Sequence, residues 1–450
     1  MIKRNLTTWL NEFYSSHRQA VLLTGARQTG KTFAIRILGK NRFKSFVEIN
    51  FLENPDAKRI FEGVQSATEI INRISVFTSQ PLVKGNTLIF FDEVQECPEC
   101  VTCIKFLVDE GSYRYALSGS LLGVELKDLR SEPVGYMEVK EVFPLDFEEF
   151  ALAIGVSPQV MHSLRESFAD RVAVDDIIHR QMLRLFQLYL VVGGMPAAVS
   201  KYLENNNLQE VITEQKSIIH LYARDIGKYD KKNKLILNEI YSLIPSELDA
   251  KTKRFILKKV DGNIKFSRTE NSFLWLKDAG VALPTYNVSE PRLPLLLNEL
   301  RSLFKLFLND VGLLCSQYAN GIQLKLLSNE CNINYGAVYE NVVAQELHAH
   351  GFSLHYFNSK QLGEVDFIVE SDGRILPIEV KSGKNYKIHR ALSNLLNSSA
   401  YDIPEAFVFC NDNLSSTGKV LYLPIYMITF LRVQDDLPLQ VYRPDISALR

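Results

Sequence analysis

The chain has 450 residues, of which 46% are hydrophobic and 23% are charged. This composition is ordinary for a globular protein, and the length favours two to four domains. The formal net charge of -1 argues against a protein held to nucleic acid by bulk charge, so such binding would need a local basic patch. No signal-peptide core and no uninterrupted run of about 20 apolar residues is visible. We therefore expect a soluble, cytoplasmic, multidomain protein that does not enter a membrane.

The first stretch with a chemical signature is AVLLTGARQTGKTFAIRIL, residues 20–38. A short buried strand is expected over 20–24 and a helix over 33–38, with G-x-x-x-x-G-K-[ST] between them. This context is typical of a P-loop, whose backbone amides and helix N-terminus face phosphate. We expect Lys31 to reach the β- and γ-phosphates of ATP and the Thr32 hydroxyl to coordinate Mg²⁺. The predicted nucleotide-binding loop consists of Gly25, Ala26, Arg27, Gln28, Thr29, Gly30, Lys31 and Thr32.

A second apolar stretch, NTLIFFDEVQ, ends in two acids. Its apolar run at 88–91 predicts a buried parallel strand, and such a strand ending in acids is typical of a Walker B element. We expect Asp92 to hold Mg²⁺ through water, and Glu93 to orient and polarise the attacking water. The later strand YRYALSGS carries Ser118 and Ser120 at its polar end. Ser118 is predicted to sense the γ-phosphate, and a simple turn is the alternative.

Three cysteines follow the Walker B acids with the spacing C-x-x-C-x-x-C, at Cys97, Cys100 and Cys103. This spacing overlaps iron–sulfur and zinc patterns, but a fourth ligand at a matching distance is missing. The stretch CVTCIKFLVDE reads as an amphipathic helix, which would align the thiols along one flank. We therefore favour small, buried, free thiols over a metal site.

Several motifs together resemble one protein family. They are TGARQTGKT, FFDEVQECP, LSGSLLG, PVGYMEVKEVFPLDFEEF, GGMP at 193–196 and YARDI at 222–226. LKDAGVAL, FKLFLNDVGLL and GAVYENVVAQEL extend the likeness to nearly the whole chain. In this order the motifs resemble the prokaryotic AAA-type (AAA_14) ATPases that carry a DUF4143 C-terminal region.

The resemblance implies an α/β fold with four parts. A P-loop core with a parallel sheet is expected at 1–150, and a helical lid at 151–227. A winged helix is expected at 228–290, and an α/β domain similar to PD-(D/E)xK nucleases at 291–450. The resemblance also implies an oligomer, since AAA-type ATPases usually complete their site with a neighbour's arginine. Arg114, Arg130 and Arg224 are candidates, but each is better explained as a surface or salt-bridged arginine, so none is assigned as catalytic.

Basic residues gather in the middle of the chain, between residues 231 and 259. They could contact a phosphate backbone. Acids are interleaved with them, so a solvated helix face is an equally open explanation. The cluster consists of Lys231, Lys232, Lys234, Lys251, Lys253, Arg254, Lys258 and Lys259.

Charged and apolar residues alternate in GEVDFIVESDGRILPIEVKSGK, residues 363–384. On a strand, residues two apart share a face, so Glu379 lies beside Lys381. From the residues alone, such a hairpin is either a salt-bridged solvent face or a metal site. The nuclease resemblance implies that Glu340 on a helix, with Asp366 and Glu379 on strands, holds Mg²⁺. It implies that Lys381 orients or deprotonates the attacking water.

One departure from the nuclease pattern is visible, because Val365 stands where the pattern's name has proline. That position is not a metal ligand, so the chemistry does not depend on it. We predict a protein that binds ATP and Mg²⁺, hydrolyses ATP, and couples its nucleotide state to a nuclease-like domain acting on nucleic acid, DNA first. The alternative is a nucleotide-dependent switch whose inactive nuclease-like domain binds a protein partner.

Overall fold

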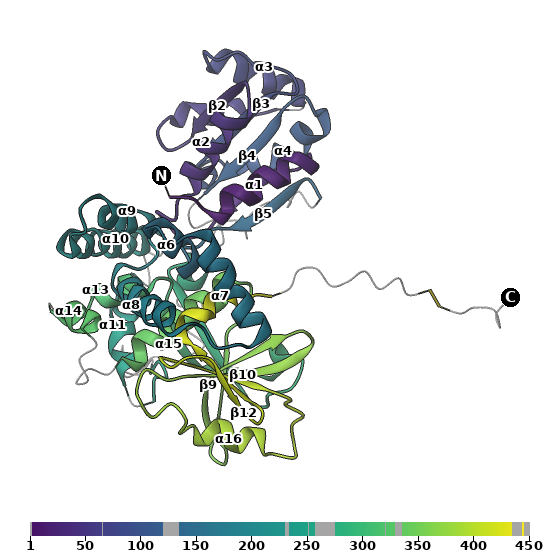
Figure 1. The fold of residues 1–450 in the computed structure, drawn as a ribbon. Coiled ribbons are helices and arrows are strands. Elements are labelled where there is room, and N and C mark those ends of the chain that lie inside the picture. The colour runs from purple at the N-terminus through teal and green to yellow at the C-terminus, as the bar shows by residue number, and fades with distance from the viewer. Residues whose placement is uncertain are drawn as a thin grey trace.

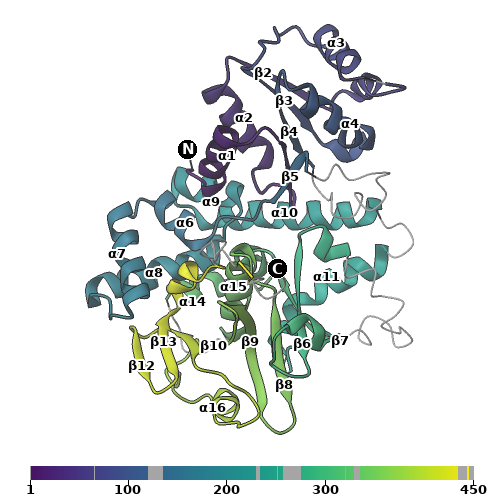
Figure 2. The same cartoon turned by 90° about the vertical axis from the view of Figure 1, so that its right-hand side faces the viewer.

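The computed structural model describes residues 2–64, 66–119, 135–229, 234–250, 252–256, 275–319, 321–328, 335–433 and 443–444. The described chain forms one sheet in its N-terminal part and a second in its C-terminal part, with a group of helices between them (Figures 1 and 2).

The N-terminal sheet has five strands in the order β2-β3-β4-β1-β5, all parallel. Helices α1 and α2 pack on one face of the sheet, and α3 and α4 pack on the other. Every residue of β3 is buried, as expected for a central parallel strand. The predicted P-loop fold with a parallel sheet is confirmed. Its elements are α1 (Asn5–Ser16), β1 (Ala20–Thr24), α2 (Lys31–Arg42), β2 (Ser45–Asn50), η1 (Pro55–Ile60), α3 (Ala67–Phe77), β3 (Thr87–Asp92), η2 (Val94–Glu96), α4 (Pro98–Glu110), β4 (Arg114–Ser118) and β5 (Met137–Glu141).

Helices follow the first sheet through the region where we expected a lid. Among the described residues, no single helix is long and apolar enough to cross a bilayer. The helices α8 (Asp176–Val192) and α9 (Pro196–Asn205) reach the required length and apolar composition only when taken together, and they are bent by 119° relative to each other. Helix α10 lies across the junction between the N-terminal sheet and the rest of the molecule (Figures 1 and 2). The helices are α6 (Phe147–Ile154), α7 (Pro158–Asp170), α8 (Asp176–Val192), α9 (Pro196–Asn205), α10 (Leu208–Tyr229) and α11 (Lys234–Asp249).

The Gly-Gly pair of the GGMP motif lies where three parts of the chain meet. The Gly194 amide donates to Asp310 Oδ2 at 2.6 Å, and the Gly194 carbonyl accepts from the Leu145 amide at 2.7 Å. A Cβ atom at Gly194 would collide with the Leu145 carbonyl, and one at Gly193 with the Asp310 carboxylate. Glycine is therefore required by close backbone approach and not only to end α8.

The C-terminal sheet has eight strands in the order β12-β13-β11-β10-β9-β8-β6-β7. Helix α15 packs with α13, α14 and the central helices on one face, and α16 packs on the other. The elements are β6 (Ala282–Val288), η5 (Leu295–Asn298), β7 (Glu299–Leu308), α13 (Val311–Ser316), α14 (Ile322–Leu327), α15 (Gly336–Ala349), β8 (His355–Ser359), β9 (Gly363–Ser371), β10 (Arg374–Val380), α16 (Arg390–Leu396), β11 (Ala406–Cys410), β12 (Ser415–Thr417), β13 (Val420–Pro424) and η6 (Ile425–Phe430).

The winged helix expected at 228–290 is not seen in the described residues. Its expected strand, β6, pairs with β7 and with β8, so it belongs to the eight-stranded sheet. All seven residues of β6 are buried, and a strand buried on both faces needs a large sheet with helices on it, which a small wing cannot supply. The boundary drawn at 290/291 therefore runs through one continuous sheet.

Candidate functional site

The P-loop connects β1 to α2 in the conformation that its sequence predicts. Gly25 has φ 113° and Gly30, which caps α2, has φ 95°, so both lie in the left-handed region. A Cβ atom at Gly25 would collide with the Val142 carbonyl. Thr29 Oγ1 donates to the Ala26 carbonyl at 3.0 Å and closes the loop on itself. The loop is therefore a compact turn at a helix N-terminus, which favours anions.

Lys31 folds back across this loop. Its Nζ donates to the carbonyls of Gly25 at 2.9 Å and Ala26 at 2.7 Å. Burial lowers the pKa of Lys31 to about 8, and the negative charges of Glu93 and Asp92 oppose that shift. The ammonium therefore stays protonated at neutral pH and lies in the field of both predicted Walker B acids.

Asp92 lies at the end of β3 and collects neutral hydrogen-bond donors. Thr32 Oγ1 lies 3.2 Å from both of its carboxylate oxygens, and Ser118 Oγ donates to Oδ1. Asn50 Nδ2, at the end of neighbouring β2, donates to Oδ2 at 3.1 Å. Burial raises the pKa of Asp92, and the hydrogen bond from Ser118 opposes this. A carboxylate beside a hydroxyl offers the oxygen ligands that Mg²⁺ prefers, so the pair fits that ion.

Three of these four residues were predicted from sequence, and Asn50 was missed. Asn50 is the register partner of Asp92 in the parallel pair β2–β3. A polar residue at the carboxyl end of a strand beside the Walker B strand was the available signal, because such ends meet at one edge of the sheet.

Glu93 follows directly and has left-handed backbone angles, with φ 55°. Gln95 Nε2 donates to its Oε2 at 2.5 Å. Two of the arginines considered for completing a neighbour's site are described. Arg114 begins β4 at the end opposite Ser118, and Arg224 is exposed on α10. Ser120 and Arg130 lie outside the described residues.

The middle of the P-loop is tied to α10. Arg27 Nη1 forms an ion pair with Asp225 Oδ1 at 3.0 Å, and the Tyr222 hydroxyl donates to the Arg27 carbonyl at 2.9 Å. Both partners are buried. The YARDI segment therefore serves the nucleotide loop through its tyrosine and aspartate, a role that the sequence analysis did not assign.

The predicted C-terminal residues lie on the expected elements. Glu340 is in α15, Asp366 is in β9, and Glu379 and Lys381 are at the end of β10. Asp366 Oδ2 accepts from the Val380 amide at 2.9 Å, and Lys381 Nζ lies 2.6 Å from Glu379 Oε1. Burial, then the charge of Asp366, raises the pKa of Glu379 to about 8, while Lys381 opposes the shift.

Two lysines that the sequence analysis did not connect with these acids change the character of the cluster. Lys305, in β7, is fully buried and lies 3.5 Å from Glu340 Oε2 and 2.9 Å from Glu364 Oε1. Lys253 forms a second ion pair with Glu340 Oε1. Burial opposes the charge of Lys305, but the nearby acids more than compensate and raise its pKa. A lone lysine inside the apolar strand LFKLFL was the available signal.

The three carboxylates expected to share Mg²⁺ are near enough to act on one another, because burial and then the charge of Asp366 raise the pKa of both Glu340 and Glu379. Among the described residues, no group of three or more His, Cys, Asp or Glu side chains is placed to hold a metal ion. At Glu340, the ammonium groups of Lys253 and Lys305 contact the two carboxylate oxygens and compensate the charge that would attract a metal ion. As expected from the sequence, Cys97 and Cys100 are free thiols buried in the core of the N-terminal domain.

The cluster of basic residues between 231 and 259 can be followed only in part. Lys253, which is described, is used internally by its ion pair with Glu340. The members that lie outside the described residues are Lys231, Lys232, Lys251, Lys258 and Lys259.

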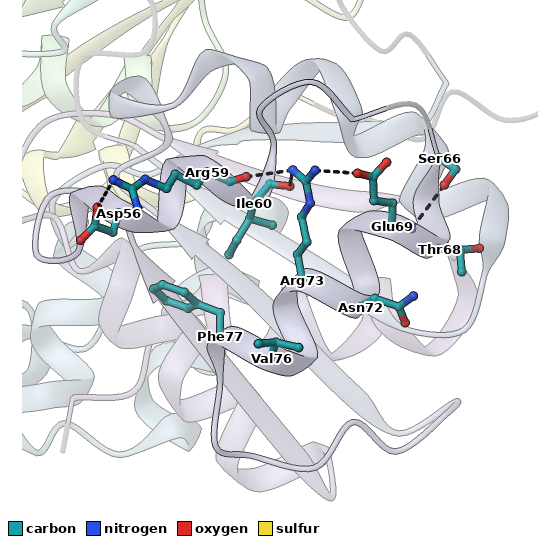
Figure 3. A pocket seen from close by; sticks show the side chains of 10 residues that line it. All are labelled: Asp56, Arg59, Ile60, Ser66, Thr68, Glu69, Asn72, Arg73, Val76 and Phe77. Carbon is teal, nitrogen blue, oxygen red and sulfur yellow. Dashed lines mark hydrogen bonds and ion pairs between the residues drawn. The ribbon is translucent and has the colours of Figure 1, made fainter.

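A shallow hollow of about 720 Å³ lies between η1 and α3 (Figure 3), and no P-loop residue lines it. Val76 and Phe77 form its exposed apolar wall. Arg73 donates to the carbonyls of Arg59 at 2.9 Å and Ile60 at 3.3 Å, and pairs with Glu69. Its charge therefore joins η1 to α3 at the edge of the hollow.

Three family models match parts of the chain. They are an AAA domain at residues 17–151, a domain of unknown function (DUF8612) at 183–325, and a domain of unknown function (DUF4143) at 335–428. The second model was not anticipated, and it spans the predicted boundaries at 227/228 and 290/291. No curated protein matches the chain.

Solved structures resemble the chain at low identity. The Walker-type ATPase PABY2304 of Pyrococcus abyssi is 14% identical, with 70% of this chain and 96% of that chain covered and a TM-score of 0.43. The Aeropyrum pernix ORC1 protein in complex with DNA is 16% identical, with 72% and 91% covered and a TM-score of 0.27. Cdc6p from Pyrobaculum aerophilum is 14% identical, with 73% and 96% covered and a TM-score of 0.26. Nothing about ligands or partners follows from scores this low. By its family matches and its P-loop geometry, the chain contains an AAA domain in its N-terminal part and a DUF4143 region in its C-terminal part.

Proposed function

We propose that the protein binds ATP with Mg²⁺, hydrolyses ATP, and uses its nucleotide state to move the C-terminal domain relative to the AAA domain. The observation that carries the ATP site is the meeting of the P-loop with Asp92, where Thr32, Ser118 and Asn50 surround one carboxylate. Neutral donors leave the negative charge of Asp92 available to a cation.

The residues have separate tasks in this proposal. The loop amides and Lys31 bind the phosphates, while Thr32 and Asp92 hold Mg²⁺. The ion, when bound, neutralises charge that develops on the phosphate oxygens. Glu93 accepts a hydrogen bond from the attacking water and polarises it, and Gln95 keeps its carboxylate in place through the 2.5 Å hydrogen bond.

Coupling to the rest of the molecule is proposed to begin at Arg27. An ATP phosphate at the P-loop competes with Asp225 for the guanidinium, because both are anions and Arg27 belongs to the loop. Loss of that ion pair would free α10, which packs on α9, α11 and α13. A nucleotide that binds the two arrangements unequally shifts the population between them.

For the C-terminal domain we favour a docking role over cleavage. Lys305, Lys253 and Lys381 each contact an acid of the cluster. These contacts offset the negative charge that a catalytic Mg²⁺ would need. In this form the protein is a nucleotide-dependent switch, and a protein partner or nucleic acid is what the domain would bind.

A metal-dependent nuclease is the second candidate, and one observation favours it. Glu379 Oε2 is buried and has no hydrogen-bond partner among the described residues, which is a position that a cation or a water could occupy. The order of helix acid, strand aspartate and Glu-x-Lys on the next strand also agrees with the nuclease resemblance.

One experiment tests the proposal and separates the two candidates. The full chain is incubated with single-stranded, duplex and branched DNA and with RNA, in Mg²⁺ or Mn²⁺, with and without ATP, and both phosphate release and cleavage are measured. We expect ATP turnover without cleavage. Cleavage that disappears in Asp366→Ala would favour the nuclease, and the absence of ATP turnover in every condition would contradict the ATPase.

A further inference from the structure

Arg4, which immediately precedes α1, bonds through three guanidinium nitrogens to three separate acceptors. Nε donates to Glu149 Oε2 at 2.8 Å, Nη1 to the Thr29 carbonyl at 3.1 Å, and Nη2 to the Phe143 carbonyl at 2.8 Å. The Asn5 amide donates to the other oxygen of Glu149 at 2.6 Å. Because a guanidinium is planar with donors in fixed directions, these bonds set the position of Thr29 relative to α6.

Thr29 is the point at which Arg4 touches the nucleotide loop. It is fully buried, it closes the loop through its bond to the Ala26 carbonyl, and it precedes Gly30, the cap of α2. A carbonyl fixed from outside orients the following peptide, whose amide belongs to the predicted phosphate cradle. Arg4 therefore acts on the loop without being part of the motif.

The same arginine is linked to the C-terminal domain through α6. Asp146 caps α6 and accepts from the Glu149 amide at 2.7 Å. Its other oxygen lies 3.3 Å from His350 Nε2 and 3.0 Å from Arg432 Nη2. His350 directly follows α15, the helix that carries Glu340 of the charged cluster.

We propose that Arg4 is a positioning residue of the nucleotide site, which holds the P-loop at Thr29 and connects it to α15 through Glu149, Asp146 and His350. This inference rests on the proposed function, because the position of the loop matters only if the loop binds ATP. Arg4 lies outside the P-loop and Walker motifs. Its route from the nucleotide site to α15 is separate from the contact between the P-loop and α10.

The test uses the full chain and four proteins: wild type, Arg4→Ala, Arg4→Lys and Arg36→Ala. Arg36 is a matched control, since it lies on α2 and pairs with Glu48 at 2.6 Å on the surface without touching the loop. Binding of a fluorescent ATP analogue gives Kd, and phosphate release gives kcat and KM.

We expect Arg4→Ala to raise Kd and KM about tenfold or more while kcat at saturation changes by less than about threefold, as for a loss of uniform binding. Arg4→Lys should recover less than about half of this effect, on a logarithmic scale, because an ammonium cannot replace a planar fork. Arg36→Ala should stay within about twofold of wild type, as expected for an exposed ion pair.

Each outcome has one meaning. If wild type binds no nucleotide, the proposed function fails and Arg4 is not at issue. If wild type binds but Arg4→Ala matches Arg36→Ala, the role of Arg4 is overturned. Should Arg4→Ala not fold, Glu149→Gln keeps the shape of the contact and removes its charge; we expect its Kd to rise about threefold, and an unchanged Kd would overturn the inference.

The link to α15 has its own measurement. ATP binding to wild type should change amide hydrogen exchange at residues 336–349, and this change should be lost in Arg4→Lys at a saturating ATP concentration. An equal change in both proteins would overturn the route to α15 while leaving the loop contact in place.

Discussion

Asp92 and Glu340 are both buried carboxylates, exposed by only 3% and 2%, but their partners differ in charge. Asp92 is held by the hydroxyls of Thr32 and Ser118 and by an amide. Glu340 is held by the ammonium groups of two lysines. Neutral donors satisfy lone pairs and leave the net charge in place, whereas ammonium groups cancel it.

The two regions also differ in what surrounds the carboxylate. Asp92 lies at the carboxyl end of a parallel sheet, beside the N-terminus of α2, where open α/β sheets place their ligands. Glu340 lies within α15, and nearly every residue of that helix is buried. We therefore expect chemistry in the first region and internal charge compensation in the second, and four predictions test this difference.

The largest effect is expected in the nucleotide site. Lys31→Ala should abolish detectable ATP binding, because the loop loses its only internal ammonium. Glu93→Gln should keep ATP affinity and lower turnover by about 10²–10⁴-fold, the usual contribution of a general base. Nucleotide titration and phosphate release measure the two effects. Equal ATP affinity in wild type and Lys31→Ala would remove the basis for the ATP site.

The second prediction concerns the charge compensation in the C-terminal cluster. Lys305→Met should lower the free energy of unfolding by about 3–5 kcal/mol, because it leaves the buried Glu340 and the partly exposed Glu364 beside an uncharged side chain. Urea unfolding without divalent ions measures this.

Two comparisons make the Lys305 result specific. Lys58→Met breaks the half-exposed pair with Glu96 and should cost less than about 1 kcal/mol. The double variant Lys305→Met/Glu364→Gln should recover most of the loss, since both charges of that pair are removed together and Glu340 keeps its ion pair with Lys253. A cost for Lys305→Met no larger than for Lys58→Met would contradict charge compensation.

The third prediction uses the junction between the two regions. Burial raises the pKa of Glu346 to about 7; His350 opposes the shift and Asp146 adds to it. The Tyr189 hydroxyl lies 2.6 Å from the Leu145 carbonyl and 3.1 Å from Glu346 Oε1. Glu346 Oε1 also accepts from the Phe147 amide at 2.9 Å, and the hydrogen bonds from Phe147 and Tyr189 oppose the rise in the pKa of Glu346.

The sign of the pH effect follows from this raised pKa. Between the unfolded value of 4.5 and the folded value of about 7, the folded protein binds more protons at Glu346. Its stabilising contribution is complete below pH 4.5 and is lost as the pH rises through 7. From pH 4.5 to 8, wild type should therefore lose about 3 kcal/mol more than Glu346→Gln in urea unfolding. Glu204→Gln, at an exposed position on α9, is the control, and parallel curves for Glu346→Gln and wild type would contradict the prediction.

The smallest effect is expected at the contact between the P-loop and α10. Asp225→Asn removes the charge that pairs with Arg27 and should cost about 1–2 kcal/mol of stability. It should also reduce the change in hydrogen exchange that ATP causes in α10, because the ion pair to be broken is already gone. Asp170→Asn, at an exposed position in α7, is the control and should show neither effect. An undiminished ATP response in Asp225→Asn would exclude this ion pair as the coupling contact.

Much of the nucleotide site could be predicted because its signals are local. The strand at 20–24, the loop and α2 follow one another in sequence, and Lys31 bonds to residues five and six positions before it. Asn50, Tyr222 and Asp225 could not be assigned in the same way, because their partners lie 42, 195 and 198 residues away.

The winged helix is a prediction for which the local sequence pattern was not enough. Within the expected range of 228–290 the described residues contain one strand, β6, and its antiparallel partner β7 lies beyond that range. What the pattern could not contain is the parallel pairing of β6 with β8, whose residues are about 70 positions later in the sequence. Strand partners outside a hairpin depend on which faces are buried in the folded chain.

The sequence by itself determined the P-loop, the Walker B strand and the elements that carry Glu340, Asp366 and Glu379. These features depend on backbone conformation and on the periodicity of apolar residues, and both are set by residues that are close in sequence. Only the tertiary structure decided which charges face each other. Lys253 meets Glu340 across 87 residues, and Arg4 meets Glu149 across 145. Charge pairing requires contact in space, and contact between distant residues is set by how the helices and sheets pack.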